Sequence, residues 1–187
     1  MSEISTELAM QARRGGRAVG ALFFAFFGAV WLLIAYQLAH AHSWIPVALV
    51  LTAALMLVLA AVTVLRKRRS AMRAVRQSPD SRRMRRQFRA INAVQWITII
   101  TAVVLLQKFK LDVWIVPAIM LIVGLHFLPL AHVFRYRPHY VSGAILIVTA
   151  MLYPIASPGG PGSPLGSLVA GMTLWSAALW SLRPAER

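Results

Sequence analysis

The 187-residue chain contains no cysteine. This absence excludes disulfides, thiolate metal ligands and cysteine nucleophiles. Acidic residues are scarce as well, with five Asp and Glu against 20 Lys and Arg. The five are Glu3, Glu7, Asp80, Asp112 and Glu186. None lies inside a long apolar run, which disfavours three kinds of membrane protein that need a buried carboxylate: acid-relay transporters, aspartyl intramembrane proteases and carboxylate metal sites.

Several catalytic motifs are also missing from the sequence. It has no Gly-x-Ser-x-Gly elbow, no His-Glu-x-x-His pair and no Gly-rich phosphate loop followed by Lys. We therefore do not predict an enzyme, and we expect no cofactor and no metal site. A membrane enzyme that acts on lipid stays open only as the third alternative.

Long apolar segments are what the chain does have. Hydrophobic residues make up 59% of it and charged residues 13%, about half the charged share of an ordinary soluble domain. Six segments are free of charge and long enough to cross a bilayer. They span about 18–39, 44–65, 90–107, 113–134, 140–156 and 165–182. The last two are divided by a stretch dense in Pro and Gly, 157–164, which no helix survives. The sequence predicts an all-α polytopic membrane protein, residues 1–187 forming one domain of six transmembrane helices arranged as three hairpins.

The cations orient these helices. Eighteen of the 20 Lys and Arg residues fall on one side of the predicted membrane, and only Lys108 and Lys110 fall on the other. Because cytosolic loops carry the excess of Lys and Arg, the side with eighteen cations is predicted to be cytosolic. Both termini then lie in the cytosol, and the protein is predicted to be multi-pass in the cell (inner) membrane.

The segment 66–89 is the most basic part of the chain. It carries eleven cations against the single Asp80, and Pro79 breaks it near the middle. We predict that it forms a basic cytosolic helical hairpin with its tip at the proline. Such a hairpin can bind anionic headgroups, at about 1 kcal/mol for each cation, or it can dock an acidic partner or nucleic acid. We favour lipid and expect no nucleic acid; the predicted lipid contacts are Arg82, Arg83, Arg85 and Arg86.

Small residues form a stripe on the first and on the last apolar segment. They are Ala21, Ala25 and Ala29 in the first, and Gly166, Ala170, Ala177 and Ser181 in the last. Such stripes let two helix backbones approach closely in lipid. One stripe is expected to pack inside the chain, and the other could pack on a second copy, which leaves a homodimer open.

Two histidines are the titratable residues at membrane depth. His126 and His132 lie on the fourth segment with Pro129, a predicted kink, between them. A polar side chain at this depth is costly without a partner and is therefore a candidate site. The third segment offers three polar residues at matching depth: Asn92, Gln95 and Thr98. The two imidazoles are about 240° apart around the helix, so they do not chelate one metal.

Two interpretations of these residues stay open. They can line a polar pocket that opens toward the cytosol, or they can hydrogen-bond to one another and lock two helices together. Our leading prediction is a small inner-membrane protein that binds or passes a small solute or ion through the helical bundle. The alternative is a non-transporting scaffold or regulator whose basic hairpin binds anionic lipid or a partner protein.

Overall fold

The structure, a computed structural model, describes residues 3–75 and 79–183. Within this part of the chain every regular element is helical. The long helices are α1 (Glu3–Leu38), α2 (Trp44–Val75), α3 (Pro79–Lys108), α4 (Ile115–Phe134), α5 (Pro138–Ala156) and α6 (Pro164–Leu182), and two short 3₁₀ helices, η1 (Asp112–Trp114) and η2 (Gly160–Gly162), lie in turns. All six long helices are long and apolar enough to cross a membrane. The all-helical class and the six apolar helices are confirmed.

The predicted break between the last two apolar segments is also confirmed. α5 ends at Ala156 and α6 begins at Pro164. Between them Gly159 and Gly160 take positive φ angles of 92° and 59°, which glycine adopts without strain. The hydroxyl of Ser163 then accepts a hydrogen bond from the backbone N–H of Leu165 and caps α6.

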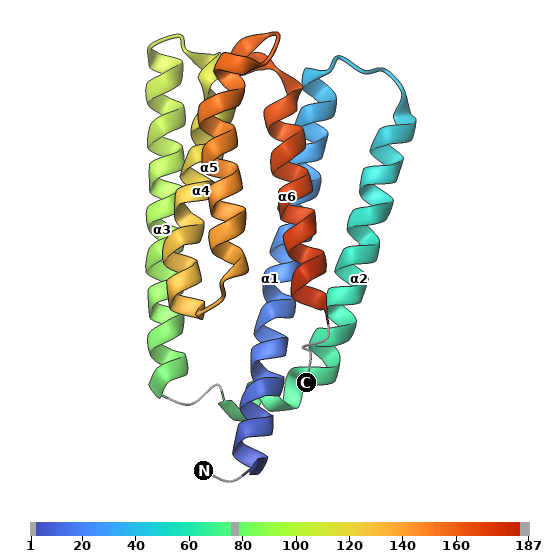
Figure 1. Ribbon diagram of the computed structural model, residues 1–187, viewed down its shortest axis with the longest axis vertical. Coiled ribbons are helices and arrows are strands. Elements are labelled where there is room, and N and C mark those ends of the chain that lie inside the picture. Colours follow the sequence, from blue (N-terminus) through green and yellow to red (C-terminus); the bar gives the residue numbers. More distant parts are fainter. Residues whose placement is uncertain (1–2, 76–78, 184–187) are drawn as a thin grey trace.

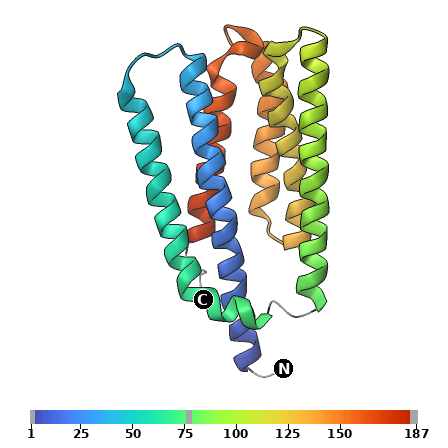
Figure 2. The ribbon, with the colours of Figure 1, turned by 180° about the vertical axis from the view of Figure 1, so that it is seen from behind.

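The helices do not follow one another in space as they do along the chain. Their spatial order is α2, α1, α6, α5, α4, α3: α1 packs along α2 and α6, α4 packs along α3 and α5, and α5 meets α6. α2 and α3 therefore stand at opposite edges of the bundle, as both views show (Figures 1 and 2). The α1, α2 and α6 group and the α3, α4 and α5 group form two halves, joined by α5 and α6.

This order differs from the predicted basic hairpin. α2 and α3 are not packed side by side, and the basic end of α2 packs on α1 instead. Ala71 is buried there, and a Cβ on Gly15 of α1 would collide with the side chain of Met72. Ser81 of α3 donates a hydrogen bond to the carbonyl of Val75, the last residue of α2. Residues 76–78 of the predicted tip lie outside the described residues.

The contact between α1 and α6 is made by small residues. A Cβ on Gly171 would lie 2.9 Å from the carbonyl oxygen of Gly28 and 2.6 Å from Cγ of Leu32. Trp175 of α6 donates its indole N–H to the carbonyl oxygen of Ala25 at 3.1 Å. The members of both predicted stripes are buried within the chain. Neither stripe is therefore left for a second copy, and the predicted homodimer loses the feature that suggested it.

Candidate ligand site at the basic end

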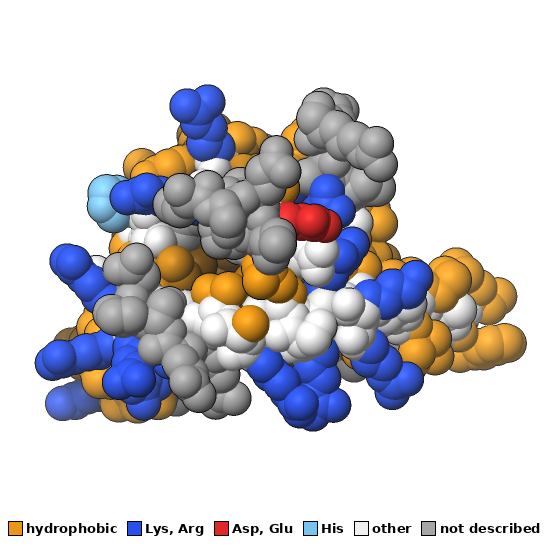
Figure 3. Space-filling model, turned by 90° about the horizontal axis from the view of Figure 1, so that it is seen from below, with side chains coloured by type: hydrophobic (Ala, Val, Ile, Leu, Met, Phe, Trp, Pro, Cys, Tyr) orange, Lys and Arg blue, Asp and Glu red, His pale blue; other side chains and the backbone are white. Residues whose placement is uncertain are grey.

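One end of the bundle, here called the basic end, holds the start of the apolar part of α1, the α4–α5 turn and the last turn of α6 (Figure 1). Seen from below, Lys and Arg side chains surround its rim, with few acidic side chains among them (Figure 3). The opposite end, the far end, carries the α1–α2, α3–α4 and α5–α6 turns.

Unpartnered polar atoms gather at the basic end. Five buried side-chain nitrogen and oxygen atoms in the described residues have no hydrogen-bond partner. Four of them belong to Arg17, His126, Tyr136 and His139, here called the polar cluster; the fifth, Oγ of Ser167, is on α6. The cluster combines residues from α1, α4, the α4–α5 turn and α5. It therefore lies where the two halves face each other.

The α4–α5 turn positions Tyr136 and His139. Arg135 ends α4 in a left-handed conformation with a φ of 48°. The backbone N–H of Tyr136 then bonds back to the carbonyl of Ala131 at 3.0 Å, a helix-ending arrangement that satisfies a free carbonyl. Pro138 starts α5 at its first turn, where its missing N–H costs nothing. His139 is thus already helical, and its side chain is 9% exposed.

Aromatic rings surround His139. Its ring centroid lies 4.9 Å from that of Tyr136, 5.6 Å from Phe24 and 5.6 Å from Phe127. Phe24 comes from α1 and Phe127 from α4, so long side chains, rather than close backbones, join the two halves here. Phe127 also contacts His126, with centroids 6.2 Å apart. The two imidazoles therefore flank one phenyl ring.

Arg17 closes the cluster from the side of α1. Its Nη2 donates a hydrogen bond to the carbonyl oxygen of Trp180, near the end of α6, at 3.0 Å. Its guanidinium carbon lies 5.2 Å from the ring centroid of Tyr136, a distance typical of a cation–π contact. Its Nε is buried without an acceptor. One edge of the guanidinium is thus held by α6, and the Nε edge is left without a partner.

The predicted site residues are only partly brought together. The imidazole of His126 is hydrogen-bonded to the backbone of Ile91 on α3, and its Nδ1 has no partner. Asn92 and Gln95 are half-buried on α3. Thr98 is exposed and bonds to the carbonyl of Val94, one turn back on its own helix. Thr98 therefore does not extend the amide row into the bundle.

His132 is separate from the polar cluster. Its side chain is exposed and lines a pocket of about 280 Å³ at the α4–α5 turn, together with Arg135, Arg137 and Tyr140. Tyr136 also lines this pocket, so its ring stands between the pocket and the cluster. α4 continues through Pro129 to Phe134.

The predicted lipid contacts are exposed at the start of α3. They are Arg82, Arg83, Arg85 and Arg86. Consecutive helix residues are about 100° apart, so these four side chains spread over an arc of about 160°, on one side of the helix. In the described part of the chain, no three His, Asp or Glu side chains are grouped as a metal site.

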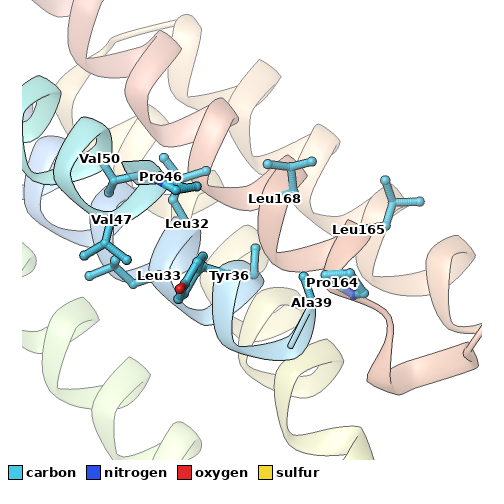
Figure 4. A pocket seen from close by; sticks show the side chains of 11 residues that line it. Leu32, Leu33, Tyr36, Ala39, Pro46, Val47, Val50, Pro164, Leu165 and Leu168 are labelled. Atoms are coloured by element: carbon cyan, nitrogen blue, oxygen red, sulfur yellow. The ribbon is translucent and has the colours of Figure 1, made fainter. Parts of the chain in front are cut away.

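A second and larger pocket lies at the far end. It has a volume of about 410 Å³ and is formed between α1, α2 and α6 (Figure 4). Leu32, Val47, Val50 and Leu168 are among the apolar side chains in its wall. Its one polar side chain, Tyr36, donates its hydroxyl to the carbonyl of Ser43 at 2.8 Å. This pocket offers a ligand space and apolar surface, but it has no unpaired polar group that could recognise a particular ligand.

Sequence reasoning missed three of the four residues of the polar cluster. Tyr136 and His139 fall between the predicted segments 113–134 and 140–156, and Arg17 lies just before the predicted segment 18–39, where it is only one of the cations on the cytosolic side. Pro138 is the signal that could have found His139, because a proline in the first turn marks a helix start. Nothing in the sequence pairs Arg17 with Tyr136, which lies more than a hundred residues further along the chain.

No protein-family model, curated protein or solved structure matches this chain. The function is therefore argued from the geometry of its own residues.

Proposed function

We propose that this chain is a multi-pass protein of the cell (inner) membrane, with its basic end in the cytosol, and that it binds or passes a small solute at the polar cluster. The observation that carries the proposal is the collection of four unpartnered polar atoms from separate helices in one place. Six apolar helices and the one-sided distribution of cations support the membrane and its orientation.

Polar atoms buried without a hydrogen-bond partner destabilise the folded protein. A buried donor or acceptor without a partner costs about 1–3 kcal/mol, and lipid tails cannot supply the missing bond. Ser167 shows that the bundle tolerates one such atom in isolation. Four such atoms on residues linked by ring contacts, one of them a guanidinium nitrogen, support a binding site.

Access to the cluster is supported by the neighbouring pocket. Tyr136 is one of the residues that line the pocket of about 280 Å³ at the α4–α5 turn. On the proposed orientation this pocket opens on the cytosolic side, where a dissolved solute can enter. A rotation of the Tyr136 side chain would join this pocket to His139.

The alternative of a scaffold that binds anionic lipid keeps one supporting observation. The four exposed arginines at the start of α3 share one side of the helix, a concentration of cations that suits a surface of anionic headgroups. Such lipid contact is compatible with solute binding and does not account for the polar cluster.

The proposal can be tested by ligand-induced stabilisation of the purified protein. Phosphate, acetate, tetramethylammonium and glycerol serve as probes of four charge and shape classes, and the midpoint of thermal unfolding in detergent is measured. At least one probe should raise the midpoint of the wild type and fail to raise that of His126→Leu or His139→Leu. Both variants should stay folded, because each removes an unpaired buried atom.

His42→Leu is the matched control, since His42 is an exposed residue at the far end. It should respond to the probe as the wild type does. If none of the four probes shifts the wild type, or if both site variants respond like His42→Leu, the solute-binding proposal is rejected.

A further inference from the structure

We infer that the polar cluster is a site for an oxyanion, a carboxylate or phosphate group, held by Nε–H of Arg17 with the hydroxyl of Tyr136 and the imidazole of His139. This inference rests on the proposed function and narrows it to one class of ligand. It depends on three observations: which atoms are unpaired, where the acidic residues lie, and how Arg17 is oriented.

Three of the four unpaired atoms, those of Arg17, Tyr136 and His139, can donate a hydrogen bond. Nε–H of Arg17 can only donate, because the guanidinium stays protonated and has no acceptor atom. The phenol hydroxyl can donate, and an imidazole can carry its proton on Nδ1. A point where donors converge, at least one of them obligatory, is complementary to a ligand that presents acceptors. Carboxylates and phosphates present the most acceptor oxygens at one place.

The charge of Arg17 has no counter-ion in the described part of the chain. The acidic side chains that are described lie elsewhere: Glu7 accepts a bond from Gln11 near the start of α1, and Asp112 lies at the far end. Arg17 is half-buried and its Nε is fully buried, and a cation withdrawn from water without a compensating anion is unfavourable. Water would accept hydrogen bonds from its N–H groups but would leave its charge uncompensated. An oxyanion accepts the same hydrogen bonds and also compensates the charge. The surrounding cations of the basic end raise the local concentration of anions.

The guanidinium is also oriented for this task. The Trp180 carbonyl holds Nη2, and the Tyr136 ring lies under the guanidinium plane. These two contacts restrict the side chain before a ligand arrives, so little conformational freedom is lost on binding. Tyr136, whose ring contacts Arg17, is also in ring contact with His139, so the three side chains are neighbours.

Two sources can supply such a group: a free anion from the cytosol, or the phosphate of an anionic lipid at the membrane surface. Two measurements separate them. The first uses lipid-stripped protein and inorganic phosphate at constant ionic strength. A rise in the unfolding midpoint then reports binding of the free anion. Native mass spectrometry of protein taken from bilayers of phosphatidylglycerol or of phosphatidylcholine reports a retained headgroup.

Arg17→Gln is the decisive variant, and Arg13→Gln is its control. Both remove one positive charge from α1, but Arg13 is exposed whereas Arg17 is in the cluster. Arg17→Gln should weaken phosphate binding about tenfold or more, the effect of losing a charged hydrogen bond, or should abolish the retention of phosphatidylglycerol. Arg13→Gln should match the wild type in both measurements.

Tyr136→Phe keeps the test decisive if Arg17→Gln does not fold. It retains the ring that contacts Arg17 and His139 and removes only the hydroxyl. Phosphate affinity should fall about threefold to tenfold, while the empty protein should be no less stable. Tyr36→Phe at the far end, whose hydroxyl is already bonded within the chain, should not change phosphate affinity.

Three results would overturn the oxyanion inference. The first is an equal loss of phosphate affinity in Arg17→Gln and Arg13→Gln, which would indicate a non-specific effect of net charge. The second is a rise in the unfolding midpoint with tetramethylammonium or glycerol and with neither phosphate nor acetate. That result would support solute binding but contradict an oxyanion as the ligand. The third concerns Glu186, which lies outside the described residues: if Glu186→Gln destabilises the protein as Arg17→Gln does, and the two changes are not additive, the acceptor is the chain's own carboxylate.

Discussion

α1 has two contrasting neighbours. Toward α6 it presents Gly28 and Ala25, and the backbones come so close that a Cβ on Gly171 would lie 2.9 Å from a carbonyl oxygen. Toward α4 and α5 it presents Phe24 and Arg17, and the facing rings are 5.6 Å apart between centroids. The first contact includes a satisfied indole hydrogen bond, and the second contains the four unpaired atoms.

This contrast shows how a small bundle can separate stability from binding. Close packing of small residues supplies the van der Waals contact that holds helices together in lipid. A contact made by long side chains keeps the backbones apart and leaves room for polar groups between them. α1 uses one face for each purpose, so the two purposes should respond differently to substitution.

The largest effect is expected on the tight side. Gly171→Leu would place a branched side chain against Leu32 and the backbone of Gly28. Because a backbone carbonyl cannot move aside cheaply, α1 and α6 must separate, and we expect a loss of about 3 kcal/mol in the free energy of unfolding. Chemical unfolding in detergent micelles measures it. Gly16→Leu should have little effect, since nothing lies within 4 Å of a Cβ there; equal losses would contradict the tight packing.

A smaller loss is expected on the polar side. Phe24→Ala leaves a cavity beside Phe127 and His139. Only the lost packing counts, because lipid solvates apolar side chains as well as the core does, so we expect about 2 kcal/mol. The control is the adjacent Phe23→Ala, whose ring is 49% exposed. If the two alanine variants unfold at the same midpoint, the aromatic contact between the halves does not hold them together.

The two smallest expected changes in stability, those of Trp175→Phe and Tyr136→Phe, have opposite signs. Trp175→Phe removes an indole N–H that is bonded to Ala25 and should lower stability by about 1 kcal/mol. Tyr136→Phe removes a hydroxyl that is buried without a partner and should raise the stability of the empty protein by about 1 kcal/mol. Unfolding midpoints measured without added ligand compare them directly. A loss of stability in both variants would mean that the Tyr136 hydroxyl has a structural partner.

The apolar spans could be predicted from the sequence, but not the full lengths of all the helices, since α1 begins at Glu3, well before the predicted segment 18–39. The segments predicted at 44–65 and 165–182 fall within α2 and α6, and the Pro- and Gly-rich block separates α5 from α6 as expected. These features depend on local properties, namely uninterrupted apolar composition and the backbone limits of Pro and Gly. The packing of the basic end of α2 on α1 was not predicted, because it depends on contacts between distant segments.

The candidate site was predicted only in part, and Thr98 shows why. Asn92, Gln95 and Thr98 are each three residues apart, but every step of three falls about 60° short of a full turn. Thr98 is therefore rotated about 120° from Asn92 and is exposed. Which direction around a helix faces inward is decided by its neighbours, and the sequence does not name the neighbours.

The sequence by itself determined the helical class and the number and approximate limits of the apolar helices, because a bilayer imposes the same length and polarity on every span independently of the others. It also showed that no carboxylate lies within the predicted apolar segments. Only the tertiary structure decided that α2 and α3 stand apart at opposite edges, and that Arg17, Tyr136 and His139 meet. Those outcomes depend on the packing of side chains between distant segments, which no local pattern encodes.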